Sequence, residues 1–368
     1  MGTQSRILLL LFATALGLRI LYSVVLGTQT DLVTNLVTSD LNYAREIASG
    51  SGWIHEPYSP RSPGYPVVLG SFYLLSGKQL WLTTFFQAIL GALTVLFTYR
   101  LGALFLSRGL AAIAALWFAF HVYHMHLSTI FHRDVLSAFL LIVLVFYLVR
   151  PFEKMRYAPI AGLVFAALFH VDPQFILLLP IFVLITLFKS RHGILNVQYL
   201  FLFLSMFIVA SIPWTVRNLT VYGQPIPVGL EARRYLRPAK TVMTEPERGI
   251  SELEQKIFSA SRAELVQTNA VEFWRFARFR ADTPAGIAPE DSAYQALVVP
   301  AWSFRHNLVS IVNFGLVLPF FLLGIVAAVR NRQREALMLA LIVAVFFVMR
   351  MYLGANERIR IPMDPLII

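Results

Sequence analysis

Polar residues able to do chemistry gather in one stretch of an otherwise apolar chain. The stretch contains Asp40 and Tyr43, and it ends in a proline-rich run with Arg61 and Tyr65. A carboxylate such as Asp40 can act as a general base, and an arginine can bind a phosphate through two parallel hydrogen bonds. The alternative role is structural, because Ser39 or Asp40 precedes apolar residues at helical spacing and could cap a short helix. This stretch by itself leaves both roles open.

Two more carboxylates border apolar segments. Asp134 directly precedes the segment 135–149, where it could cap a helix and complement its dipole. Asp172 lies in the turn His170-Val171-Asp172-Pro173. Carboxylates at the edge of a membrane segment are costly and usually face a polar cavity or a partner. If these acids and Asp40 lie on the same side of a membrane, a functional site is expected there.

The composition is that of a polytopic membrane protein. Of the 368 residues, 57% are hydrophobic and 14% are charged, whereas about a quarter of the residues in soluble domains are charged. The net charge of +11 comes mostly from short basic clusters between apolar segments, which are typical topology signals, so no nucleic-acid partner is expected. The first apolar segment, 7–26, is as long as a bilayer core and lacks a clear cleavage site, which predicts a retained helix.

Nine apolar segments are long enough, or nearly so, to cross a bilayer. They lie at residues 7–27, 80–100, 109–127, 135–149, 157–171, 174–188, 197–215, 307–329 and 336–353. With the N-terminus in the cytoplasm, the basic clusters between them fall on the inner side, as the positive-inside rule requires. The clusters contain Arg100, Arg108, Arg150, Lys154, Arg156, Lys189, Arg191, Arg330, Arg332 and Arg334. The sequence thus predicts an all-α polytopic membrane protein with a single transmembrane domain over residues 1–368.

The segments left outside include two long loops. The first loop, 28–79, holds Asp40. The second, 216–306, has a helical middle that ends in a helix with one aromatic and one basic side, which is typical of an interfacial helix. This helix could float at the lipid headgroups or form one wall of an entry for a lipid substrate. Two short outer turns carry Asp134 and Asp172, so all three acids are predicted on one side.

Metal chemistry is not indicated. Cysteine is absent, which excludes thiolate catalysis, disulfides and cysteine-ligated metals. His121, His124 and His126 lack the pairing on one helix face and the carboxylate partner of zinc motifs, so we interpret them as lining the outer end of a helix. No cofactor is expected, and a divalent cation stays an open alternative.

Three groups of residues resemble the motifs of one enzyme superfamily. The first is Ser39-Asp40-Leu41-Asn42-Tyr43-Ala44 with Pro60-Arg61-Ser62-Pro63-Gly64-Tyr65-Pro66. The second is Ile212-Pro213-Trp214-Thr215-Val216-Arg217-Asn218 with Tyr222-Gly223 and Pro225-Ile226-Pro227-Val228, and the third is Asn356-Glu357-Arg358-Ile359-Arg360-Ile361-Pro362 with Pro365. Together they resemble the lipid-linked-sugar glycosyltransferases of the GT-C superfamily, in the branch of the protein O-mannosyltransferases and the aminoarabinose transferase of lipid A.

The resemblance implies a GT-C-like helix bundle with helices in its outer loops and an active site on the periplasmic or lumenal side. There a sugar would pass from a polyprenyl phosphate to an acceptor hydroxyl with inversion. Asp40 matches the family's catalytic acid and is assigned as the base, and Asp134 would orient the acceptor or the sugar. The residues expected to bind substrate or phosphate are Tyr43, Arg61, Tyr65, Arg217, Glu357 and Arg358. For Arg217, the alternative is an interface anchor beside Trp214.

The resemblance also implies a location and partners. We expect a multi-pass protein of a bacterial inner membrane, which binds a polyprenyl-phosphate sugar, membrane lipids and an acceptor that the sequence does not identify. Two departures from the family open a second hypothesis. An acid, Asp172, stands where the family tends to have a cation, and the chain stops at Ile368, where relatives continue into another hydrophobic segment.

The second hypothesis is therefore an inactive membrane subunit that binds a lipid or a protein partner within a complex. A third hypothesis is a transporter whose outer carboxylates bind a coupling ion. The sequence does not favour a transporter, because it lacks two related halves with broken helices and charges near the bilayer midplane.

Overall fold

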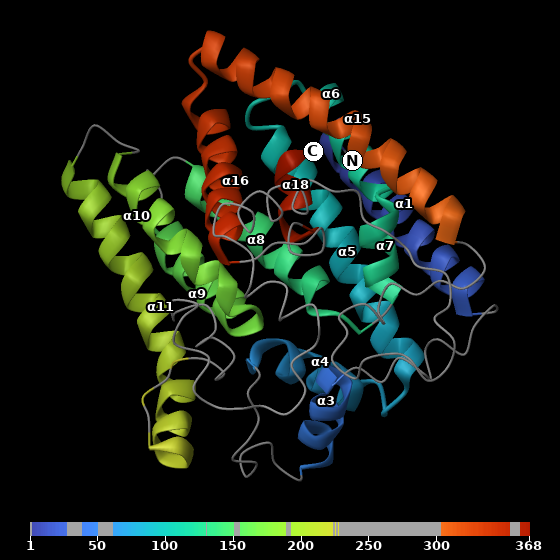
Figure 1. The fold of residues 1–368 in the computed structure, drawn as a ribbon, viewed down its shortest axis with the longest axis vertical. Coiled ribbons are helices and arrows are strands. Elements are labelled where there is room, and N and C mark those ends of the chain that lie inside the picture. Colours follow the sequence, from blue (N-terminus) through green and yellow to red (C-terminus); the bar gives the residue numbers. More distant parts are fainter. Residues whose placement is uncertain are drawn as a thin grey trace, which may run out of the picture.

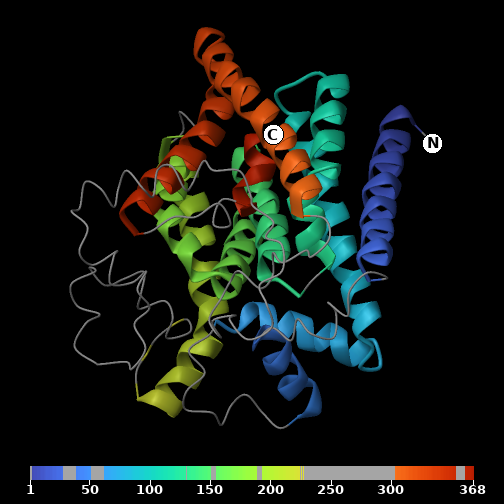
Figure 2. The same ribbon diagram turned by 45° about the vertical axis from the view of Figure 1, so that its right-hand side comes forward.

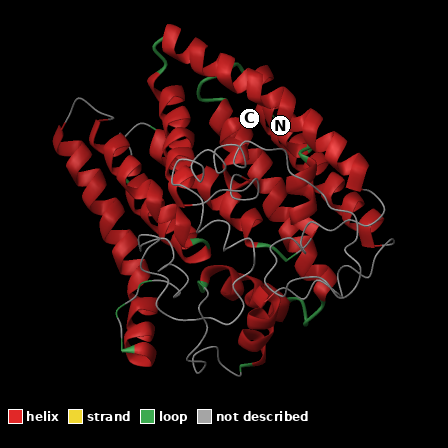
Figure 3. Ribbon diagram, viewed as in Figure 1, coloured by secondary structure: helices red, strands yellow, loops and turns green. Residues whose placement is uncertain are grey.

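The computed structural model describes residues 2–27, 39–50, 62–129, 131–150, 155–188, 193–223, 225, 227, 303–353 and 361–368. Within these ranges the chain is helical and contains no strand (Figure 3). The predicted all-α fold is thereby confirmed.

The helices follow one another in a simple order (Figure 1). They are α1 (Thr3–Gly27), α3 (Ser39–Ser49), α4 (Gly64–Leu75), α5 (Leu80–Gly102), α6 (Arg108–Ala119), α7 (Val122–Thr129), α8 (Arg133–Val149), α9 (Tyr157–Val171), η1 (Pro173–Leu178), α10 (Leu179–Phe188), α11 (Gly193–Tyr222), α15 (Ser303–Arg330), α16 (Arg334–Leu353), η5 (Ile361–Met363) and α18 (Asp364–Ile367).

Each of the nine apolar segments forms helix, with two differences from a single straight span. The third segment breaks into α6 and α7, which meet at an angle of 53°. The break lies at His121, whose Nδ1 accepts a hydrogen bond from the backbone N–H of His124 and so supports a new helix start. The sixth segment begins as the 3-10 helix η1 before it continues as α10.

Length and composition suit three of the described helices for crossing a membrane. These are α1, α5 and α11, and the bent pair α6 and α7 makes a fourth if it counts as one span. Large apolar side chains stay exposed on their outer faces, for example Leu10 on α1 and Phe201 on α11. Such surfaces are unfavourable in water and suit a lipid environment. The chain is a multi-pass membrane protein.

Helices α3 and α4 form a separate layer at one end of the bundle (Figures 1 and 2). The turns from α5 to α6 and from α15 to α16 lie at the opposite end. The short helix from Ser39 was predicted, whereas α4 was not, because residues 64–75 lie within the predicted first outer loop. Their apolar content is explained by packing of α4 against α3, α5 and α9.

Candidate active site

Asp40 is held at the bundle end by the packing of α3 on α4. Leu41 and Ala44 of α3 and Tyr65 and Leu69 of α4 are buried in one apolar cluster. Helix α3 begins at Ser39, so Asp40 lies inside its first turn, where the helix dipole stabilises a carboxylate. The side chain is 8% exposed. Asp40 therefore lies within the helix, one residue after its start.

The motif around Gly64 packs against the last residues of α9. A Cβ atom at Gly64 would lie 2.6 Å from the carbonyl carbon of His170 and 2.6 Å from the backbone nitrogen of Val171. Only a residue without a side chain permits this approach of α4 to α9. The first-loop motif and the turn that departs from the family pattern are thus parts of one packed unit.

Asp172 has a structural role in that turn. It precedes η1, and its carboxylate accepts hydrogen bonds from the backbone nitrogen of Gln174 at 3.3 Å and from the Gln174 Nε2 at 2.6 Å. The side chain is buried. Because the acid caps η1 and binds Gln174, its presence in place of a cation has a local explanation.

Asp134 lies at the start of α8 and is also buried. The helix cap is His132, whose Nδ1 accepts a hydrogen bond from the Asp134 backbone nitrogen at 3.2 Å. The alternative in which Asp134 itself caps the helix is wrong, since α8 begins at Arg133, two residues earlier than expected. The His132 Nδ1 also lies 3.2 Å from the Asp134 Oδ2. Nδ1 can accept from the amide as a lone pair or donate to the carboxylate as N–H, so its protonation selects the contact.

Tyr65 joins these two acids into one cluster. Burial raises the pKa of the Tyr65 phenol well above its ordinary value, and the carboxylates of Asp40 and Asp134 raise it further. The Gln87 side chain beside the hydroxyl partly offsets this effect on the pKa. The phenol thus stays protonated at neutral pH and can donate a hydrogen bond. Leu41 of α3 and Val135 of α8 pack in the same apolar cluster as Tyr65, so the residues next to both acids surround the phenol's helix.

The other predicted residues have different positions. Tyr43 is half-buried on α3, one helical turn after Asp40. The Arg217 Nη1 donates to the Asn218 Oδ1 at 2.9 Å, and the guanidinium lies 4.8 Å from the centre of the Trp214 ring. The end of α11 lies apart from α3 in Figures 1 and 2. Arg217 therefore lies over the ring of Trp214, as expected for the alternative in which it is an interface anchor.

Arg61, Glu357 and Arg358 lie outside the described residues, as does the predicted interfacial helix within 216–306. Among the residues that the structure describes, no group of three or more acidic or histidine side chains is arranged to hold a metal ion. Asp134 contacts His132, and Asp172 accepts hydrogen bonds from Gln174.

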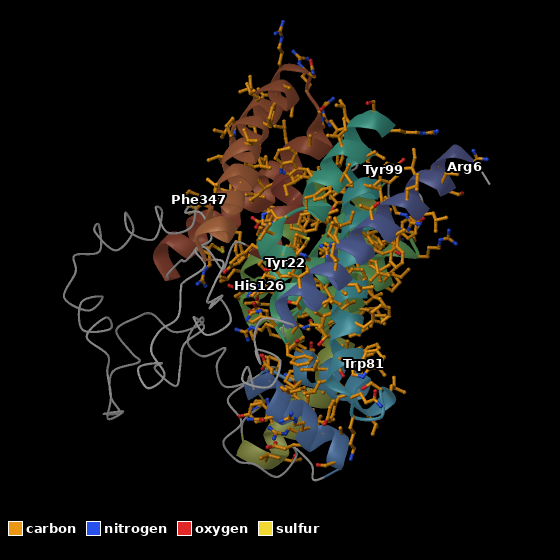
Figure 4. All side chains as sticks on the ribbon, turned by 90° about the vertical axis from the view of Figure 1, so that its right-hand side faces the viewer. Arg6, Tyr22, Trp81, Tyr99, His126 and Phe347 are labelled. Carbon is orange, nitrogen blue, oxygen red and sulfur yellow. The ribbon has the colours of Figure 1, made fainter. Side chains whose placement is uncertain are left out.

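A polar contact between α1 and α7 was missed by the sequence reasoning. The Arg19 Nη2 lies 3.2 Å from the His124 Nδ1, and the Tyr22 hydroxyl lies 3.3 Å from the His126 Nδ1 (Figure 4 shows Tyr22 beside His126). Arg19 in the middle of an apolar span was the available signal, because an arginine there needs a buried partner.

A comparison with known families tests the resemblance. Residues 59–216 match the model of a family described as dolichyl-phosphate-mannose-protein mannosyltransferase. This range is similar to that family of glycosyltransferases. The matched range includes Gly64, Tyr65 and Asp134. Asp40 precedes this range, and Arg217 directly follows it. No curated protein matches the chain. The family supports a membrane glycosyltransferase of the GT-C type.

Proposed function

We propose that this protein transfers a sugar from a polyprenyl-phosphate donor to an acceptor hydroxyl on the outer side of the membrane, with inversion. The observation that carries the proposal is that Tyr65 packs in one apolar cluster with Leu41 and Val135, the residues that follow Asp40 and Asp134 in the chain. The family match adds the reaction class. A buried pair of acids beside a neutral hydrogen-bond donor suits a transfer that must move one proton and orient two substrates.

In the proposed reaction, Asp40 takes the proton of the acceptor hydroxyl while the acceptor oxygen attacks the anomeric carbon. The bond from that carbon to the phosphate oxygen breaks, and the polyprenyl phosphate leaves with the electron pair. Asp134 and Tyr65 orient the acceptor or the sugar through hydrogen bonds, and Tyr43 borders the same helix face as Asp40. Since the leaving phosphate gains charge, nearby cations would stabilise it.

Arg61 is the first candidate for this role, because it directly precedes Ser62 and the motif that contains Gly64. Arg217, Glu357 and Arg358 are further candidates for substrate binding. We place the protein in a bacterial inner membrane with a cytoplasmic N-terminus. The inactive-subunit alternative rested partly on the turn at Asp172, and the contacts of that acid with Gln174 now explain the turn by local structure.

The test is the substitution Asp40→Asn in membranes supplied with dolichyl-phosphate mannose and a panel of other polyprenyl-phosphate sugars. Loss of a general base should lower the rate of sugar transfer by about 10²–10⁴-fold. Glu46→Gln removes a carboxylate from the same helix and should leave the rate within about twofold of wild type. Full activity of the Asp40→Asn protein would remove Asp40 as the base. Absence of transfer by wild-type protein with every donor would favour the inactive-subunit alternative.

A further inference from the structure

Arg19 is the most deeply buried charged side chain of the first helix. It is 0% exposed, although α1 has exposed apolar side chains such as Leu21 nearby. An arginine within an apolar span is unfavourable unless its hydrogen-bond donors are satisfied inside the protein. Its Nη1 donates to the Ala15 carbonyl at 3.0 Å, and its Nη2 contacts the His124 Nδ1 at 3.2 Å. The arginine therefore makes one contact within α1 and one contact with α7.

The structure makes room for this side chain. A Cβ atom at Gly91 of α5 would collide with the Arg19 side chain and would lie 2.8 Å from the Ser128 Oγ. Gly91 thus allows α5 to pass directly over the guanidinium and the end of α7. The Ser128 hydroxyl donates to the His124 carbonyl at 2.8 Å, within α7. Arg19 is enclosed by α1, α5 and α7.

The contact with Arg19 determines the tautomer of His124. A guanidinium has donors and no acceptor, so the His124 Nδ1 must supply a lone pair. The ring is then neutral and carries its proton on Nε2. His121 follows the same pattern, because its Nδ1 accepts from the His124 backbone nitrogen and its Nε2 lies 3.6 Å from the Asp364 Oδ2.

The side chains of helix α7 contact two parts of the bundle. Its apolar side chains Tyr123, Met125 and Leu127 join the cluster that contains Leu41 and Tyr65 of the candidate site. Its histidines contact α1 instead. The helix therefore contacts α1 and also joins the apolar cluster of the candidate site, and the buried Phe131 and His132 connect it to the start of α8.

We propose that Arg19 is a positioning residue of the active site, which fixes α7 and the Nε2–H tautomer of His124 against α1 and thereby places the start of α8, where Asp134 lies. This inference rests on the proposed function, in which Asp134 orients a substrate. Helix α7 packs directly against α8, whose first turn contains Asp134. A shift of α7 would move Asp134 relative to Asp40 and Tyr65, and a misplacement of about 1 Å can lower a rate about 100-fold.

The activity test compares Arg19→Met with Arg6→Met. Both substitutions remove one arginine from α1, but Arg6 is exposed at the far end of the helix from Tyr22 and His126 (Figure 4). Arg19→Met should lower kcat about 10- to 100-fold while the donor KM stays within about twofold, and Arg6→Met should change neither. An unchanged kcat in the Arg19→Met protein would overturn the proposal, as would an equal loss in both proteins.

A second pair of variants separates positioning from packing. Asn has an acceptor oxygen where histidine has Nδ1, whereas Phe keeps the size of the ring without an acceptor. His124→Asn should therefore retain more activity than His124→Phe. The double variant Arg19→Met/His124→Phe should be no slower than the slower single variant, because both remove one shared contact. Multiplied losses, or a better result with Phe than with Asn, would contradict the role of the Nδ1 contact.

Two measurements do not depend on turnover. ¹⁵N NMR of labelled histidines, assigned with His124→Asn, should show His124 with an unprotonated Nδ1. Hydrogen exchange of a peptide over residues 131–135 should become faster in Arg19→Met protein and stay unchanged in Arg6→Met protein. A protonated Nδ1 or unchanged exchange would overturn the positioning role. If both results are as expected while wild-type protein transfers no sugar, the proposed function fails and the role of Arg19 in placing the turn stands.

Discussion

At the scale of single residues, Tyr65 is the group that links the two acids of the candidate site. It lies on α4, which follows the proline-rich run, it is buried, and the carboxylates of Asp40 on α3 and Asp134 on α8 both raise its pKa. Its hydroxyl is a hydrogen-bond donor over the physiological pH range because burial and both carboxylates disfavour the phenolate. A neutral donor beside two acids can hold a sugar or acceptor oxygen without adding charge.

The substitution Tyr65→Phe tests this environment through the pH dependence of stability. The pKa of the phenol is raised in the folded protein, so the favourable contribution to folding is present below the unfolded pKa of about 10 and decreases as pH rises above it. The Tm of wild-type protein should therefore fall relative to that of the Tyr65→Phe variant between pH 8 and pH 11. Thermal unfolding in detergent measures this difference. A difference in Tm that does not change with pH would contradict the buried, acid-flanked position of the phenol.

At the scale of elements, the site depends on how α4 meets the end of α9. Gly64 lets the helix start pass over the backbone of His170 and Val171, and Asp172 rigidifies the following turn through Gln174. Helix α8 brings Asp134 to the same end because His132 caps its start. The starts of α3, α4 and α8 and the end of α9 share one apolar cluster, through Leu41, Tyr65, Val135 and Val171.

The substitution Gly64→Ala tests this contact. The added Cβ would lie 2.6 Å from the backbone of the α9 turn, so either α4 or the turn must move. We expect a loss of about 1–3 kcal/mol in stability and a lower rate of sugar transfer. Gly109→Ala is the matched control, since a Cβ there meets no atom within 4 Å and the change should stay within about 0.5 kcal/mol. Equal stability of the two variants, measured by thermal unfolding, would show that the contact at Gly64 is not tight.

At the scale of the whole molecule, charge and chemistry lie at opposite ends. The turns from α5 to α6 and from α15 to α16, which belong to the basic clusters, lie at one end, and α3 and α4 with the candidate site lie at the other (Figures 1 and 2). Basic residues favour the cytoplasmic side. The arrangement supports an active site on the outer side, which is the side proposed for the transfer.

The absence of cysteine makes this orientation easy to test. Ser49→Cys adds a thiol to the exposed end of α3, and Gln333→Cys adds one to the exposed turn before α16. In intact cells or spheroplasts, a membrane-impermeant maleimide should label the first variant, and it should label the second only after permeabilisation. The reverse pattern would place the candidate site in the cytoplasm. The unsubstituted protein is the control and should remain unlabelled.

The sequence by itself determined the class of the protein and the limits of most of its helices. Apolar segments of membrane length are set by local composition, so the segments 157–171 and 80–100 were located almost residue by residue, as was the helix start at Ser39. Residue type also indicated which acids were unusual, because a carboxylate beside an apolar span is costly and usually has a polar partner or a functional role.

Only the tertiary structure decided which of these residues act together. The grouping of Asp40, Tyr65 and Asp134 depends on contacts between helices that are far apart in the chain, and so does the pairing of Arg19 with His124. The structure also showed that Asp172 has a local role as the cap of η1, unlike the other two acids. It further showed that His132 is the cap of α8. Periodicity specifies the face of a helix that is apolar, whereas packing selects the neighbour that this face meets.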